Sequence, residues 1–229
     1  MNAREDILAA VRNALGRLSV DANQVKEEAD RLLDDLPAAR PALDGMVPVD
    51  IFAARISSPK VAASLDRIGD LAELPTAVER YLLAKGLPRN VALQPVAELQ
   101  ALDWHSIALH DAPEVDECVG VGIARAGIAE TGSLVFESGP ETPVLAHFLP
   151  LHHIVLVRAH SIVMYLDDYA AATLNPQSPP HRNVNLITGA SGTTDIEGSL
   201  VLGAHGPCHL HVVILFDGKE RSVTPRPWL

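Results

Sequence analysis

The apolar positions at the start of the chain recur at helical spacing. Between residues 3 and 18 they stand three or four residues apart and form one stripe of a helix, at Ile7, Leu8, Val11, Leu15 and Leu18. A second helical pattern covers residues 23–36 and ends at Pro37, and the segment PAARPALDGMVP that follows is typical of a linker. We therefore expect residues 1–45 to form an N-terminal helical arm with a linker.

From residue 51 onward, helical patterns alternate with short aliphatic runs. The segment LAELPTAVERYLLAKG predicts a helix, and strands are predicted for NVALQP, SIALH, GSLVFE, HIVLVR, NVNLITG and LHVVILF. Residues 154–157 and 212–216 are apolar at every position, as strands covered on both faces require. The alternation predicts an α/β fold for residues 46–229, with a mainly parallel sheet flanked by helices.

Composition and charge narrow the class of protein. The 229 residues are 48% hydrophobic and carry a formal net charge of −11. Such a surface repels nucleic-acid phosphates and anionic lipids, so we expect neither nucleic acid nor membrane as a partner. The two cysteines, Cys118 and Cys208, are too few for a disulfide framework or an iron–sulfur cluster. The first residues include acids and no continuous apolar segment, so we expect a cytoplasmic protein.

The segment GIAETGSLVFESG places a carboxylate and a hydroxyl on a tight turn before a strand. Glu130 is a candidate base or nucleophile, and Thr131 and Gly132 are candidate ligand-binding residues, because glycine permits close approach of the backbone. The alternative is structural, with Glu130 and Thr131 capping a helix or satisfying a buried turn.

The segment LITGASGTTDIEGSLV has the pattern of a strand, a turn and a helix. Thr194 and Glu197 have capping-box spacing, and the N–H groups at a helix start favour an anion. The turn follows a strand, where open α/β sheets bind ligands. No Walker lysine and no G-x-G-x-x-G is present, so neither a nucleoside triphosphatase nor a nicotinamide cofactor is predicted. The alternative is a well-capped helix. The candidate ligand-binding residues are Thr188, Gly189, Ser191, Thr193, Asp195 and Glu197.

Histidines add candidate proton-transfer groups. His205 lies in a glycine turn and is a candidate acid or base, and Gly206 next to it is a candidate ligand-binding residue. His209 and His211 share one face of a predicted strand, but no third ligand is placed by spacing, so no metal site is predicted. For three further histidines a position in a polar loop that enters a sheet is favoured over a catalytic role, namely His147, His152 and His153.

Three segments, AETGSLVFESG, LPLHHIVLV and TGASGTTDIEGSLVLGAHGP, together resemble the LUD-domain family of the lactate utilization protein C (LutC/YkgG-like) group. The likeness covers residues 51–215 and includes the order and spacing of all three motifs. It implies a NagB/RpiA/CoA-transferase-like fold. It also implies iron–sulfur oxidoreductase partner subunits in the oxidation of L-lactate to pyruvate. This chain has neither the cysteines for a cluster nor a nicotinamide fingerprint, so electron transfer would occur on those subunits.

The resemblance can be carried over residue by residue. Glu130, Thr131 and Gly132 match the A-E-T-G turn of the family, and the other matching positions are Gly189, Ser191, Thr193, Asp195, Ile196, Glu197, His205, Gly206 and Pro207. The sequence departs from the pattern at Thr188, Ala190, Gly192, Thr194 and Val144. Gly192 and Val144 replace residues that are often basic, which weakens the case for phosphate binding.

Three functions are compatible with these observations. The first, which we favour, is a LutC-like subunit in L-lactate utilization that binds a small organic acid or anionic cofactor in a strand-end crevice. The second is a free-standing CoA-transferase-like or sugar-phosphate-isomerase-like enzyme that uses Glu130. The third is a non-catalytic adaptor whose N-terminal helices dock a partner or form a homo-oligomer. For the first, we expect Glu130, Thr193, Asp195 and His205 around one pocket.

Overall fold

The computed structural model describes residues 3–15, 21–34, 36–43, 45–173, 181–194 and 199–218. The contacts between residues divide the chain into two units, Met1–Ala42 and Leu43–Leu229. Among the helices of the described residues, none is both long enough and apolar enough to cross a bilayer.

The first unit consists of helices in its described part. It contains α1 (Ala3–Ala14), α2 (Ala22–Asp34) and the single turn α3 (Leu36–Ala39). The short helix α3 lies where the linker was expected to begin. The apolar stripe of α1 is exposed along its length, at Ile7, Leu8, Val11 and Leu15. Leu18 lies outside the described residues.

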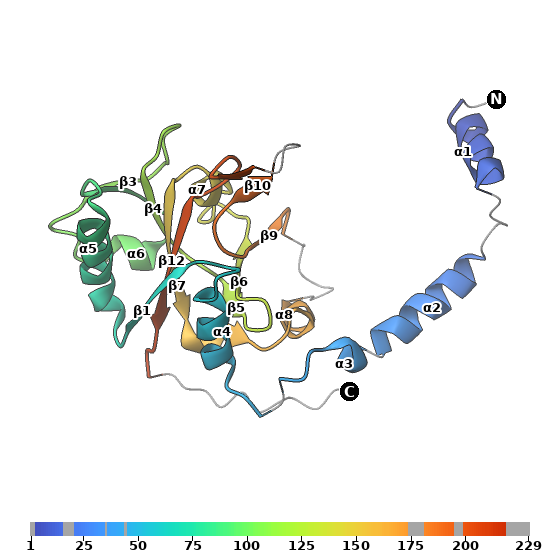
Figure 1. The fold of residues 1–229 in the computed structure, drawn as a ribbon, viewed down its shortest axis with the longest axis horizontal. Helices are drawn as coiled ribbons and strands as arrows, with labels where there is room; N and C mark the ends of the chain where they lie inside the picture. The colour runs from blue at the N-terminus through green and yellow to red at the C-terminus, as the bar shows by residue number, and fades with distance from the viewer. Residues whose placement is uncertain are drawn as a thin grey trace. The chain divides into compact units, whose positions relative to one another are not determined.

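Six parallel strands form the central sheet of the second unit, in the order β1-β12-β7-β4-β2-β3 (Figure 1). Their bounds are β1 Ser64–Ile68, β2 Asn90–Leu93, β3 Ala108–His110, β4 Val119–Ile123, β7 His152–Arg158 and β12 His209–Leu215. The fully apolar stretches predicted for double burial belong to β7 and β12, which lie inside the sheet. The prediction of a mainly parallel α/β sheet is confirmed.

A second sheet has the order β8-β5-β6-β9. Its strands are β5 Ala126–Ile128, β6 Ser133–Glu137, β8 Ile162–Val163 and β9 Val184–Ile187. Strand β6 is antiparallel to both β5 and β9, whereas β5 and β8 are parallel. The predicted strands GSLVFE and NVNLITG therefore belong to this sheet and not to the central one.

The central sheet is covered on both faces (Figure 1). One face packs against α5 (Leu74–Lys85) and α6 (Ala97–Gln100), and the 3-10 turn η1 (Leu71–Glu73) leads into α5. The other face packs against α4 (Pro48–Ile56) and the inner side of the second sheet. Short elements complete the unit, namely α7 (Leu145–Phe148), η2 (Ala159–Ser161) and α8 (Leu166–Thr173).

The helix predicted after residue 193 is wrong. Residues Gly192–Thr194 form β10, which pairs antiparallel with β11 (Leu200–Leu202). The β-branched side chains of Thr193 and Val201 stand opposite each other, and such pairs favour a strand over a helix. Among the described residues of this segment no helix starts that could supply the expected anion site. Asp195 and Glu197 lie outside the described residues.

Candidate functional site

Two of the turns singled out in the sequence lie side by side. The hydroxyl oxygens of Thr131 and Ser133 are 2.7 Å apart, and those of Ser133 and Thr188 are 2.5 Å apart. Ser133 is buried, whereas Thr131 and Thr188 are exposed. The structure thus joins the turn between β5 and β6 to the end of β9 through a chain of three hydroxyl groups.

The glycines of these turns are needed for close packing. Gly132 and Gly189 have φ angles of 74° and 86°, which L side chains rarely adopt. A Cβ atom on Gly132 would stand 3.0 Å from Cβ of Arg55 in α4, and one on Gly189 would come closer than 3.0 Å to the carbonyl oxygen of Val61. Both glycines therefore let the turns pack against α4 and the segment after it.

Glu130 serves a helix terminus in this structure. Its Oε1 atom accepts a hydrogen bond of 2.8 Å from the backbone N–H of Leu166, the first residue of α8. The backbone N–H of Glu130 donates to the carbonyl of Met164 at 3.0 Å. Glu130 therefore caps a helix, which is the structural role considered above as the alternative to a catalytic one.

We predict that Glu130→Ala lowers the free energy of unfolding by about 1 kcal/mol, because the N–H of Leu166 loses its acceptor. Glu130→Gln is expected to cost less, since the amide oxygen still accepts. Urea denaturation measures both, with Asp116→Ala in an exposed turn as the control. Equal stability of Glu130→Ala and the wild type would show that the cap contributes nothing.

Ser191 packs against the turn before β12 that contains Gly206 and Pro207. The N–H of Ser191 donates to the carbonyl of Pro207 at 2.8 Å, and the N–H of Gly203 donates to the carbonyl of Ser191 at 2.9 Å. Pro207 precedes β12 by two residues, so this turn lies at the amino edge of the parallel sheet. The turn does follow the carboxyl end of a strand, β9, but β9 belongs to the second sheet, so the turn does not lie at the carboxyl edge of the parallel sheet.

The expected pocket around Glu130, Thr193, Asp195 and His205 is not seen among the described residues. His205 is exposed, and no hydrogen bond or ion pair in the described part of the chain joins it to Glu130 or Thr193. Thr193 lies on the hairpin opposite Val201. Asp195 belongs to the part that is not described.

A cleft of about 620 Å³ lies at the carboxyl edge of the central sheet. It is reached by the carboxyl ends of β2, β4 and β7, the edge at which open α/β sheets bind ligands. Its floor is apolar and includes Ile123, Ala124 and Phe136. Its charged and amide-bearing walls consist of Gln94, Glu98, Arg125, Glu137, Glu141, Arg158, His160 and His181. None of the predicted site residues that the structure describes lines this cleft.

Arg158 at the end of β7 is held between two carboxylates. Its Nη1 atom donates to Oδ2 of Asp217 at 2.8 Å, and its Nη2 atom donates to Glu98. His160 lies 3.4 Å from the same Asp217. Burial alone would raise the pKa of Asp217, but the hydrogen bond from Arg158 and the nearby His160 lower it below its ordinary value. The charge of Arg158 is therefore balanced within the wall.

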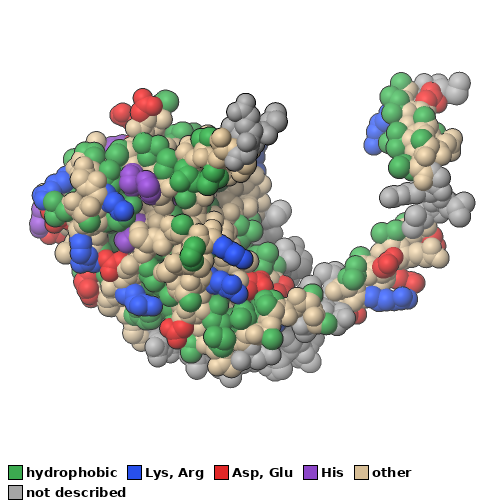
Figure 2. Space-filling view, viewed as in Figure 1, with side chains coloured by type: hydrophobic (Ala, Val, Ile, Leu, Met, Phe, Trp, Pro, Cys, Tyr) green, Lys and Arg blue, Asp and Glu red, His purple; other side chains and the backbone are tan. Residues whose placement is uncertain are grey.

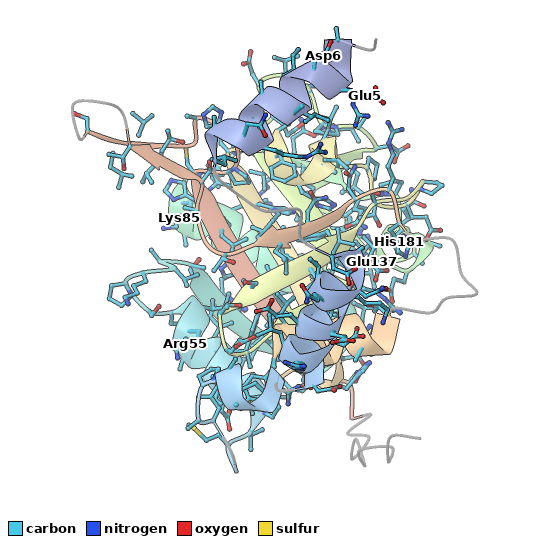
Figure 3. All side chains as sticks on the ribbon, turned by 90° about the vertical axis from the view of Figure 1, so that its right-hand side faces the viewer. Glu5, Asp6, Arg55, Lys85, Glu137 and His181 are labelled. Carbon is cyan, nitrogen blue, oxygen red and sulfur yellow. The ribbon has the colours of Figure 1, made fainter. Side chains whose placement is uncertain are left out.

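Glu137 at the end of β6 accepts one hydrogen bond and lies close to two basic side chains. The hydroxyl of Tyr169 donates to Oε1 of Glu137 at 2.5 Å, and Nε2 of His181 lies 3.1 Å from Oε2 (Figure 3). Burial and the hydrogen bond to Glu137 raise the pKa of Tyr169, so the phenol stays protonated. Arg125 approaches the same carboxylate through Nε at 3.6 Å, and its side chain is 67% exposed. Glu137 thus holds His181 and Arg125 at the cleft.

Gln94 connects the floor of the cleft to its rim. The side chain is 3% exposed, and its Oε1 accepts from the N–H of Ile123 at 2.9 Å. Its Nε2 donates to the carbonyl of Glu141 at 2.9 Å and lies 3.3 Å from the hydroxyl of Thr142. The rim is therefore held in place by a buried amide.

Two buried histidines lie beyond the floor of the cleft. The rings of His147 and His153 are 5.5 Å apart, and both contact Phe136, with centroid distances of 4.0 and 5.7 Å. No ring nitrogen of the two has a hydrogen-bond partner among the described residues. Burial lowers the pKa of His147 to about 4 and that of His153 to about 3.

A second group of histidines lies on the α5 face of the sheet. The ring of His152 stacks on His209, and the ring of Tyr81 stacks on His211, each with a centroid distance of 4.4 Å. Histidine side chains are visible on the half of the body that carries α5 and α6 (Figure 2). Within the described residues no group of three or more His, Cys, Asp or Glu side chains could hold a metal ion.

The sequence contains a signal for the cleft residues, although the strand-end rule led to a site predicted after β9. Arg158 ends a fully apolar run and Arg125 follows the end of β4 by two residues, so both stand at carboxyl ends of parallel strands. Gln94 likewise follows β2 directly. Recognising them required knowing which strands belong to the parallel sheet.

Residues 116–215 match the family model of the LUD domain. The matched region runs from just before β4 to the end of β12 and includes Arg125, Glu137, Arg158 and His181.

Curated relatives cover different shares of the chain. This chain is 27% identical over 224 residues to lactate utilization protein C of Exiguobacterium sp., and the aligned region covers 93% of this chain and 96% of that protein. It is 35% identical over 103 residues to lactate utilization protein C of Geobacillus thermodenitrificans, covering 43% of this chain and 42% of that protein.

A solved structure has the same fold. The crystal structure of a DUF162 family protein from Deinococcus radiodurans superposes with a TM-score of 0.50 and 20% sequence identity, over 73% of this chain and 96% of that one. The chain therefore contains a LUD domain over residues 116–215 and is similar to lactate utilization protein C over most of its length.

Proposed function

We propose that this protein acts in lactate utilization and binds a small organic acid or an anionic cofactor in the cleft at the carboxyl edge of its central sheet. The names of its relatives support the role in lactate utilization. The cleft, with its apolar floor and charged walls, supports the binding of a small anionic ligand.

The observation that carries the proposal is the position of Arg125. The guanidinium of Arg158 already donates to two carboxylates, so it adds no net charge for a ligand. Among the described residues Arg125 pairs only with Glu137, through Nε at 3.6 Å, so its two terminal nitrogens are available to a carboxylate in a bidentate pair. In a chain of net charge −11, such a local cation is what would recognise an anion.

The neighbouring groups have supporting roles in this proposal. Glu137 orients Arg125 and His181, and Gln94 holds the rim of the cleft in place. Glu130 has less support as a nucleophile, because its carboxylate already caps α8. Since the chain has only two cysteines, we propose that iron–sulfur partner subunits carry the electrons of lactate oxidation.

Calorimetric titration of the purified chain with L-lactate and pyruvate tests the binding step. We expect Arg125→Gln to weaken binding by about 10- to 100-fold, the loss of one charge-assisted pair. Arg67→Gln removes the same charge from β1, outside the cleft, and is expected to leave the affinity unchanged. Equal affinities of wild type and Arg125→Gln would place the ligand elsewhere.

Growth tests the role in lactate utilization separately. A strain that lacks this protein is expected to lose growth on L-lactate while still growing on pyruvate, and the wild-type chain should restore it. Unimpaired growth on L-lactate would contradict the role, whatever the titration shows.

A further inference from the structure

The β10–β11 hairpin is a two-stranded sheet of its own. Neither strand pairs with the central sheet or the second sheet, and the hairpin projects from the body (Figures 1 and 3). An isolated two-stranded hairpin is marginally stable in water unless another surface packs on it. Its connection to the body is at its base, where Ser191 bonds to Gly203 and Pro207.

Strand β11 is aliphatic and exposed at every position. Leu200, Val201 and Leu202 are 66%, 47% and 51% exposed. Gly192–Thr194 on the other strand carries no charge either. An uncharged strand edge without lysine or proline is a template for pairing with another strand.

We propose that β11 pairs antiparallel with β11 of a second copy of this chain. The order Leu-Val-Leu is the same in both directions, so a two-fold axis at Val201 places Leu200 of each copy opposite Leu202 of the other. The result is a four-stranded sheet made of two hairpins, with like residues matched across the axis. The Cys208 thiol donates to the Leu202 carbonyl at 3.6 Å, and that oxygen keeps a second lone pair for the new strand.

The strands β10 and β11 carry no charged residue, whereas Asp195 and Glu197, which lie between them in the sequence, add negative charge to each copy. Each chain carries a net charge of −11, so two copies repel each other over most of their surface. The described strands of the hairpin add no charge to this repulsion. We therefore expect a reversible dimer that salt strengthens by screening. Because three residues make a small contact, the dissociation constant should lie in the range of tens of micromolar.

Sedimentation velocity of the full chain at about 5 to 500 µM tests the proposal. The wild type is expected to shift from monomer to dimer across this range. Val201→Lys places two ammonium groups face to face on the axis and should keep the chain monomeric at every concentration. Leu200→Lys should do the same. Val115→Lys is the matched control, because Val115 is 87% exposed in a loop outside the hairpin.

Thermal unfolding of each variant separates lost association from lost folding. The substituted side chains are exposed, so the melting temperature at low concentration should match the wild type. A chain that stays monomeric throughout overturns the proposal. A dimer that persists in Val201→Lys also overturns the proposal. So does a dimer that Val11→Lys on α1 abolishes, because the contact would then belong to the N-terminal helices.

Discussion

The free energy of unfolding is expected to fall by about 4 kcal/mol between pH 7 and pH 5, because two imidazoles are buried in their neutral form. His147 and His153 are each 1% exposed, and their pKa values in the folded chain are about 4 and about 3. In the unfolded chain a histidine titrates near 6.5.

The sign follows from proton uptake. Above pH 6.5 both states are neutral at these positions and the histidines contribute no pH dependence. Below it the unfolded state binds protons that the folded state does not, so stability decreases as the pH falls. Each histidine contributes about 2 kcal/mol to the change between pH 7 and pH 5. The lowered pKa values of His152 and His211 act in the same direction.

Urea denaturation at several pH values measures this effect. His153→Leu should remove about 2 kcal/mol of the pH-dependent loss while leaving stability at pH 7 within about 1 kcal/mol, because its ring nitrogens have no hydrogen-bond partner among the described residues. His205→Leu, at an exposed position, is the control and should keep the full dependence. Parallel curves for wild type and His153→Leu would contradict the assignment.

Gly189→Ala is expected to destabilise the protein by about 3 kcal/mol or more, the second large effect. The new methyl group would come closer than 3.0 Å to the carbonyl oxygen of Val61, and backbone cannot move aside as a flexible side chain can. The φ angle of 86° adds strain for any L side chain.

Gly86→Ala separates the two causes. Gly86 ends α5 with a φ angle of 64°, but a Cβ atom there would meet nothing within 4 Å. The control should therefore show conformational strain alone, about 1 kcal/mol. Chemical denaturation of both variants gives the comparison. If Gly189→Ala costs no more than Gly86→Ala, the close approach to Val61 is not what requires glycine.

Sequence patterns predict correctly those elements whose local and tertiary preferences agree. The apolar runs of β7 and β12 predict double burial, because only strands inside a covered parallel sheet bury every side chain. The helix that ends at Gly86 is found as expected, with that glycine in the left-handed conformation. The motif order also indicated the family correctly.

The hairpin and the cleft depend on contacts between residues far apart in the sequence, which local patterns do not show. The spacing of Thr194 and Glu197 suits a helix cap, but a cap does not make a helix when β-branched residues can pair across strands. Arg125, Glu137, Arg158 and His181 have no common spacing in the sequence. They meet because β4, β6 and β7 end near one another and His181 lies just before β9. The order of strands in the sheets decides which strand ends meet, and no local sequence pattern encodes that order.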